Sequence, residues 1–158
     1  MSDNYGLFYA ILGAALVASL GGFGSALGVQ MAGKAAAGVS SEKPELFGKL
    51  LILQALPGTQ GIYGFLIAVL VLINCGVLRN APDVAMSMDT GLSYFAACIP
   101  GIIVLPISAY FQAKMAVSSI NMVAKQPDAS GKGITMTVLV ETYAVLALLA
   151  SILMVTGI

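Results

Sequence analysis

The chain has 158 residues, of which 59% are hydrophobic and only 9% are charged. Soluble domains carry about 25% charged residues, so this chain cannot hide its apolar side chains in one small core and needs lipid around much of its surface. Its 7 basic and 7 acidic residues balance, and it has no histidine. The balanced charge itself gives no information about nucleic-acid or acidic partners; we expect no nucleic-acid partner. Without histidine, the usual imidazole metal ligand is excluded.

Four apolar stretches are long enough to cross a bilayer, because about 20 helical residues span the hydrocarbon core. In chain order these predicted spans are Leu7–Ala37, Leu46–Leu78, Leu92–Ala124 and Ile134–Ile158. Short polar links join them, so sequential helices should be antiparallel neighbours in a bundle. The predicted fold is an all-α membrane protein, with residues 1–158 forming a single membrane domain.

The two halves of the chain resemble each other. Gly6-Leu-Phe-Tyr9 opens the first span, and Gly91-Leu-Ser-Tyr94 opens the third. This similarity predicts two tandem helical hairpins, residues 7–78 and 89–158. A parallel duplication of this kind differs from the inverted repeats of many transporters.

The basic residues predict the orientation of the spans. Six of the seven lie in or toward the first and third links, whereas Arg79 lies near the second; the six are Lys34, Lys43, Lys49, Lys114, Lys125 and Lys132. The positive-inside rule then places the first and third links in the cytoplasm and both termini outside. Lys114 lies inside the third span and is expected to snorkel toward the cytoplasmic interface.

The first span carries a row of small residues at three- and four-residue spacing: Ala14, Ala18, Gly21, Ser25, Gly28 and Ala32. Small residues let membrane helices approach closely. The row is predicted to pack against another helix, and we favour packing between copies of the chain over packing within one copy.

Glu141 is the one acidic residue inside a long apolar stretch. A carboxylate near the bilayer centre costs roughly 2.5–3.5 kcal/mol by insertion scales, which makes it a functional-site candidate. Counting helical rise from the lysines near the links places Gln60 and Gln112 within the same layer. Thr59 and Tyr63 share a helix face with Gln60. These side chains are predicted to converge on the carboxylate.

The layer offers oxygen atoms and one negative charge. Hard oxygen ligands suit hard cations, and one carboxylate is too little for Ca²⁺ or Mg²⁺. A monovalent ion, Na⁺ or H⁺, fits this charge. A proton needs only the carboxyl group of Glu141, so the additional oxygens of Thr59, Gln60 and Gln112 favour Na⁺.

Three segments together carry a family resemblance: Leu56-Pro-Gly-Thr-Gln-Gly-Ile-Tyr-Gly64, Gln112, and Val140-Glu-Thr-Tyr143. In combination they resemble the proteolipid K subunits of bacterial V-type ATPases, specifically the sodium-pumping branch. The resemblance implies a homo-oligomeric rotor ring in lipid, with the first span on the inner circle and the fourth facing outward. It implies Tyr63 bonded to the carboxylate, and Na⁺ ligands at the Leu56 carbonyl, Thr59, Gln60, Gln112 and Glu141.

The resemblance also implies partners. These are a stator membrane subunit that carries an essential arginine and the central stalk of a soluble ATPase sector. The chain itself has no Walker motif and is expected not to be catalytic on its own. The expected location is a bacterial cell membrane.

One alternative function is that of a proton-translocating ring of the same architecture. Another is a small four-helix cation/drug–proton antiporter, a class that usually lines its site with Trp and Tyr, whereas this chain has no Trp.

Overall fold

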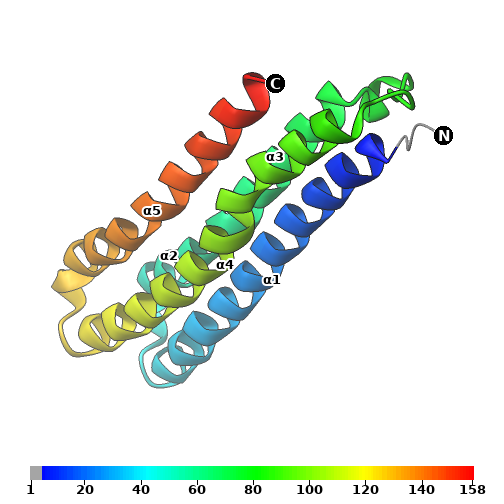
Figure 1. Cartoon of the computed structure of the whole chain (residues 1–158). Coiled ribbons are helices and arrows are strands. Elements are labelled where there is room, and N and C mark those ends of the chain that lie inside the picture. Colours follow the sequence, from blue (N-terminus) through cyan, green and yellow to red (C-terminus); the bar gives the residue numbers. More distant parts are fainter. Residues whose placement is uncertain (1–4) are drawn as a thin grey trace.

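A computed structural model describes residues 5–158, and this part of the chain is helical without strands (Figure 1). Its α-helices are α1 (Gly6–Glu42), α2 (Phe47–Ala55), α3 (Thr59–Asn74), α4 (Met88–Lys125) and α5 (Ser130–Thr156). Short 3-10 turns cover Pro44–Leu46, Leu56–Gly58, Val77–Arg79 and Pro127–Ala129. The predicted all-α fold is confirmed.

Four helical segments are long and apolar enough to cross a membrane: Gly6–Glu42, Pro44–Asn74, Met88–Lys125 and Pro127–Thr156. The four predicted spans are therefore confirmed, with different bounds. The first helix continues past Ala37 and ends next to Lys43, because the residue before a proline disfavours the helical region. The second ends before Leu78, since Gly76 adopts a left-handed conformation with φ of 74°.

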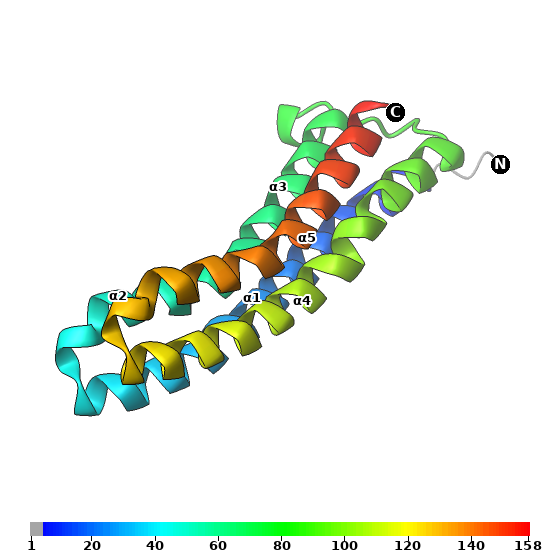
Figure 2. The same ribbon diagram turned by 90° about the vertical axis from the view of Figure 1, so that its left-hand side faces the viewer.

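The helices α1 and α4 run parallel and pack along their lengths, while α3 packs on α1 and α5 packs on α4 (Figures 1 and 2). Glycines permit the close approach of α1 and α4. A Cβ atom added to Gly91 would overlap the backbone of Gly6, and one added to Gly24 would lie 2.5 Å from the Cα of Pro106. Gly6 and Gly91 occupy corresponding positions, because each begins the segment that opens its half of the chain.

Two apolar cores stabilise the bundle. One, near the chain termini, contains Val17, Ile67 and Leu105, and the other, near the α1–α2 and α4–α5 links, contains Leu50 and Ile120. We call the end of the bundle that holds these two links the link end. The start of α1 and the end of α5 lie at the opposite end (Figure 1). The buried polar side chains described below lie between the two cores.

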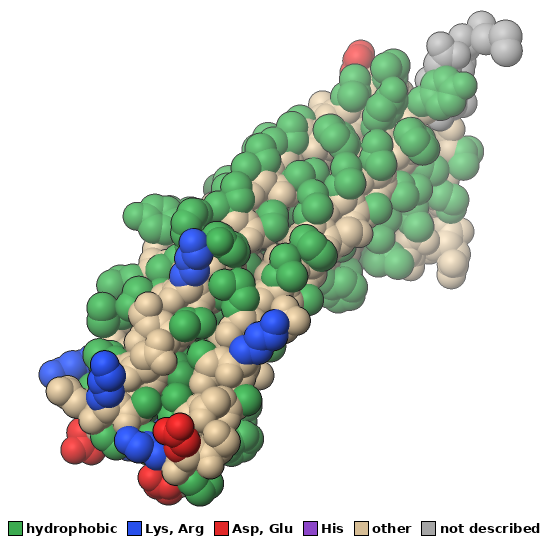
Figure 3. Space-filling view, turned by 90° about the horizontal axis from the view of Figure 1, so that it is seen from below, with side chains coloured by type: hydrophobic (Ala, Val, Ile, Leu, Met, Phe, Trp, Pro, Cys, Tyr) green, Lys and Arg blue, Asp and Glu red, His purple; other side chains and the backbone are tan. Residues whose placement is uncertain are grey.

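The outer surface is largely apolar, and charged side chains gather at the link end (Figure 3). Large hydrophobic side chains stand exposed on several helices, as with Phe23, Phe65 and Leu153, the last 70% exposed. A surface this apolar is covered by lipid or by other protein subunits.

Candidate ion-binding site

A break in the second span creates the first part of the site. Pro57 lacks an amide hydrogen, and the helix tightens into the 3-10 turn Leu56–Gly58 before α3 begins. The Thr59 hydroxyl lies 3.1 Å from the carbonyl oxygen of Leu56 and 3.4 Å from Oε1 of Gln60. The break therefore brings three oxygen atoms of different chemical kinds together at the start of α3.

Two glutamines connect α3 to α4 and α5. Gln60 and Gln112 are both fully buried. Nε2 of Gln60 donates to Oε1 of Gln112 at 2.6 Å, and Nε2 of Gln112 donates to Oε2 of Glu141 at 3.2 Å. One hydrogen-bonded chain thus crosses the bundle from α3 to α5, and the structure brings these three predicted site residues together.

Glu141 lies at the edge of the bundle with its carboxylate directed inward. Its Oε1 accepts a hydrogen bond from the Tyr63 hydroxyl at 2.5 Å, so each carboxylate oxygen has a donor. The side chain is half-buried. Its outer side meets a shallow hollow of about 450 Å³, lined otherwise by Val138, Thr142, Val145 and Leu146. The carboxylate is therefore held from within the bundle and reachable from the outer surface of α5.

Two groups of the site were missed in the sequence, the Ser108 hydroxyl and the backbone carbonyl of Thr137. Ser108 lies between Nε2 of Gln60 and the carbonyl of Val140, at 3.4 Å from each. The carbonyl of Thr137 accepts a hydrogen bond from Gln112 at 3.3 Å. Ser108 and Thr137 precede Gln112 and Glu141 by four residues, so helical spacing on one face was the available signal.

The cluster offers oxygen atoms and a single negative charge. Within residues 5–158, no three His, Cys, Asp or Glu side chains gather as a metal site. The cluster instead offers one carboxylate, two amide oxygens, a hydroxyl and a backbone carbonyl, which suit a hard cation of low charge. The Gln112 oxygen already accepts a bond from Gln60, but an amide oxygen has a second lone pair for a cation.

The small-residue face of α1 is filled by the chain's own helices. Its members are buried or half-buried: Ala14, Ala18, Gly21, Ser25, Gly28 and Ala32. A Cβ on Gly28 would lie 2.7 Å from Pro57, and Oγ of Ser25 accepts a hydrogen bond from the Gly61 amide at 2.8 Å. Within one copy, α3 and α4 therefore pack against this face, and its packing between copies stays a prediction.

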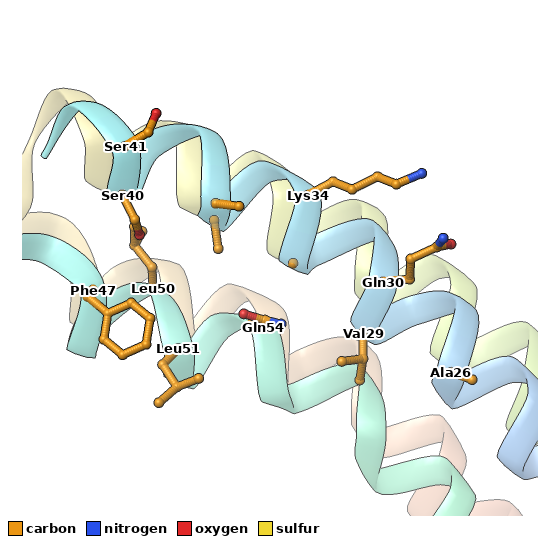
Figure 4. Close-up of a pocket in the computed structure, with 13 residues that line it drawn as sticks. Ala26, Val29, Gln30, Lys34, Ser40, Ser41, Phe47, Leu50, Leu51 and Gln54 are labelled. Carbon is orange, nitrogen blue, oxygen red and sulfur yellow. The ribbon is translucent and has the colours of Figure 1, made fainter. Parts of the chain in front are cut away.

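A larger hollow, about 830 Å³, lies between the link-end half of α1 and α2 (Figure 4). Its walls include Val29, Leu50, Leu51 and Gln54, and Gly33 leaves room for the Gln54 amide. None of the predicted ion ligands lines it. It is therefore separate from the cluster around Glu141.

The family of ATP synthase C subunits matches the chain twice, over residues 12–71 and 95–154. The chain belongs to this ATP synthase family. The first match begins in α1 and ends in α3, and the second begins in α4 and ends in α5. As a member of this family, the chain is a tandem repeat of one helical unit, as the sequence predicted.

Relatives within the family extend the comparison. The chain is 42% identical to the V-type sodium ATPase subunit K of Enterococcus hirae, over 98% of the chain and 95% of that protein. It is 37% identical to the A-type ATP synthase subunit K of Methanocaldococcus jannaschii, over 96% of the chain but only 64% of that protein. It is also 31% identical to the 16 kDa proteolipid of the V-type proton ATPase of Bos taurus, over 60% of the chain and 63% of that protein.

Proposed function

We propose that this chain is a rotor-ring subunit that binds Na⁺ at Glu141 and carries it across the membrane during ATP-driven rotary transport. One observation carries the proposal: a carboxylate within a membrane helix is held by donors from two other helices, Tyr63 and Gln112. The near-full-length similarity to a sodium ATPase subunit supports the same function.

The proposed Na⁺ ligands are the Leu56 carbonyl, Thr59, Gln60, Gln112 and Glu141. Support comes from the three oxygens assembled around Thr59 and from the hydrogen-bonded chain that ends at Glu141. Tyr63 does not coordinate the ion in this scheme. Its hydroxyl holds the carboxylate in place, as outer groups commonly do around metal ligands.

The choice of Na⁺ over H⁺ rests on the oxygen atoms beyond the carboxylate. A protonated carboxyl group needs no further ligands, whereas Na⁺ needs several oxygens to replace its water shell. The relative named as a sodium ATPase subunit matches nearly the whole chain, while the B. taurus relative named for a proton ATPase matches 60% of it. A proton ring of the same architecture is the second candidate.

Electrostatics supply the mechanism. With Na⁺ bound, Glu141 is nearly neutral, and the loaded site can face lipid as a homo-oligomeric ring turns. Empty and ionised, the carboxylate is costly in lipid unless a fixed positive charge lies beside it. An arginine of a stator membrane subunit supplies that charge in this scheme, and the central stalk of a soluble ATPase sector turns the ring. The chain is thus a transport subunit and not a catalyst by itself.

The proposed orientation places the link end in the cytoplasm of a bacterial cell and both termini outside. The lysine-rich first and third links support this under the positive-inside rule. Residues 7–78 and 89–158 are proposed as the two hairpins, with Glu141 in the second. One ion then crosses per four membrane helices.

Carbodiimide labelling tests the proposal in purified membranes, because the reagent attacks a protonated carboxyl group. Labelling of Glu141 is measured by mass spectrometry across pH, with Na⁺ or with K⁺. We expect low-millimolar Na⁺, but not K⁺, to protect Glu141. Glu45, exposed in the first link, is the internal control, and any labelling there should not respond to Na⁺.

Two other outcomes are informative. Labelling that follows pH and ignores Na⁺ would replace the sodium ring with the proton ring. A Glu141 that is not labelled under any condition would contradict both forms of ion carrier. In Glu141→Gln, we expect no labelling at position 141 and therefore no effect of Na⁺ on labelling there.

A further inference from the structure

Helix α3 begins with a backbone amide that the residue before the helix does not cap. The first amides of a helix have no acceptor within that helix, and a serine or similar residue just before it usually supplies one. Gly58 stands at this position before α3 and has no side chain to offer. Its backbone also lies in the right-handed helical region, whereas a capping residue is usually extended. The amide of Gly61, in the first turn of α3, therefore needs an acceptor from another part of the chain.

Ser25 of α1 supplies that acceptor. The backbone nitrogen of Gly61 donates a hydrogen bond to Oγ of Ser25 at 2.8 Å, and Ser25 is only 7% exposed. The two helices approach this closely because Gly61 has no side chain, since a Cβ there would lie 3.3 Å from Oγ of Ser25. Ser25 thus takes the part of an N-cap residue for α3, from a position 36 residues earlier in the chain.

Two further contacts hold α1 against the break in the second span. Toward the link end, Gly28 faces Pro57, and a Cβ on Gly28 would lie 2.7 Å from Cβ of Pro57. On the other side, Gly21 faces the backbone of Gln60, and a Cβ on Gly21 would lie 3.0 Å from the Gln60 carbonyl oxygen. Ser25 lies between these contacts on the same face of α1. The close packing on both sides therefore keeps its hydroxyl in place.

The amide that Ser25 holds belongs to the segment that carries proposed ion ligands. Thr59 and Gln60 directly precede Gly61, and the 3-10 turn Leu56–Gly58 lies directly before them. In a regular α-helix, the Gly61 amide would instead donate to the carbonyl four residues earlier. Without the hydroxyl, this amide has no water to bond within a membrane, so α3 would form that regular bond and extend backward. The turn would then rewind and move the Thr59 hydroxyl.

We propose that Ser25 is a positioning residue for the Na⁺ site, which acts through the Gly61 amide and does not touch the ion. This inference rests on the proposed function. The proposed ligands lie on the second span, α4 and α5, so α1 contributes none of them. Its part is to hold the broken segment in the shape that brings the oxygens around Thr59 together. Loss of the Ser25 hydroxyl should weaken Na⁺ binding, while the two donors to the Glu141 carboxylate remain.

The test compares Ser25→Ala with the unmodified protein in purified membranes, by carbodiimide labelling of Glu141. The Na⁺ concentration that gives half protection at constant pH should rise by about three- to tenfold, because Na⁺ binding must now also restore the shape of the broken segment. The pH of half labelling without Na⁺ should stay the same, because both donors to the carboxylate remain. A serine that only filled space would not separate these two midpoints.

Three further variants separate the capping bond from general packing. Ser25→Cys keeps the size of the side chain but offers only a weak acceptor, so it should also raise the Na⁺ midpoint. Ala14→Gly removes a buried methyl group from the same face near the start of α1. It should lower the melting temperature of the assembly without moving the Na⁺ midpoint. Ser41→Ala removes an exposed hydroxyl of α1 and should change neither property.

The outcomes distinguish this inference from the proposed function. An unchanged Na⁺ midpoint in Ser25→Ala or in Ser25→Cys would overturn the inference alone and leave the sodium site intact. An equal rise in Ala14→Gly, or a shifted pH midpoint in Ser25→Ala, would assign the effect to packing and overturn the inference as well. An unmodified protein that Na⁺ does not protect would remove the proposed sodium function, and this inference with it.

Discussion

Replacing Tyr63 with phenylalanine removes one hydrogen-bond donor from Glu141 and leaves the rest of the site intact. The hydroxyl of Tyr63 donates to Oε1 of Glu141, while Oε2 keeps its bond from Gln112. Without the first donor, the carboxylate is free to turn toward the hollow on the outer side of α5. We expect Tyr63→Phe to bind Na⁺ more weakly, because the ion shell then includes a ligand that is no longer held in place.

The size of the effect follows from the hydrogen bond. A bond to a charged group contributes about 1.5–3 kcal/mol, and each 1.4 kcal/mol changes an affinity by a factor of about ten. The bond also forms in the empty site, so only part of this energy appears in the Na⁺ affinity and the lower end of the range applies. We expect Na⁺ affinity to fall by about tenfold in Tyr63→Phe.

The assay is the Na⁺ concentration that gives half protection of Glu141 from carbodiimide at constant pH. Tyr143→Phe is the matched control, because Tyr143 lies two residues from Glu141 in the sequence but is 66% exposed. We expect its midpoint to equal that of the unmodified protein. An unchanged midpoint in Tyr63→Phe, or an equal shift in Tyr143→Phe, would refute the idea that Tyr63 holds the carboxylate.

Two further predictions concern packing and the ion shell. Gly24→Ala should lower the melting temperature, because the new Cβ would lie 2.5 Å from the Cα of Pro106 and such overpacking costs about 1–3 kcal/mol. Gly22→Ala, with nothing within 4 Å of its Cβ, should gain about 0.5–1 kcal/mol, and equal melting temperatures would contradict the packing argument. Gln112→Leu leaves the buried Gln60 amide without its 2.6 Å partner, at a cost of about 1–3 kcal/mol. The stabilisation by Na⁺ should then disappear in a thermal-shift assay, and a surviving Na⁺ shift would remove Gln112 from the ion shell.

The four membrane helices could be predicted from sequence because lipid imposes a simple length rule on apolar segments. Their ends were less predictable. The first helix extends to Glu42, because the sequence becomes polar several residues before the helix ends. Pro44, and not the polar residues before it, stops the helix. The second span contains a break at Leu56–Gly58. Pro57 lacks an amide hydrogen and favours such a break, but the sequence does not define which carbonyl the break exposes.

The layer of polar side chains was predicted in part. Counting helical rise placed Gln60, Gln112 and Glu141 at one depth, and the structure joins them by hydrogen bonds. Ser108 and Thr137 were missed. Hydroxyl side chains such as that of Ser108 are common in membrane helices, where they bond to their own backbone or to other helices, so its identity does not separate it from ordinary packing residues. Thr137 contributes its backbone carbonyl, a group that every residue has, so its identity gives no signal either.

Sequence alone determined that this is a four-span membrane protein with one carboxylate at membrane depth, because both follow from how lipid treats apolar and charged groups. Tertiary structure decided which helices meet. The small-residue face of α1 suits any helix that approaches closely. Only the fold shows that α3 and α4 of the same chain pack against it. Tertiary structure also set the register of the two parallel helices α1 and α4, since the register of helices far apart in the sequence depends on contacts such as that of Gly24 with Pro106.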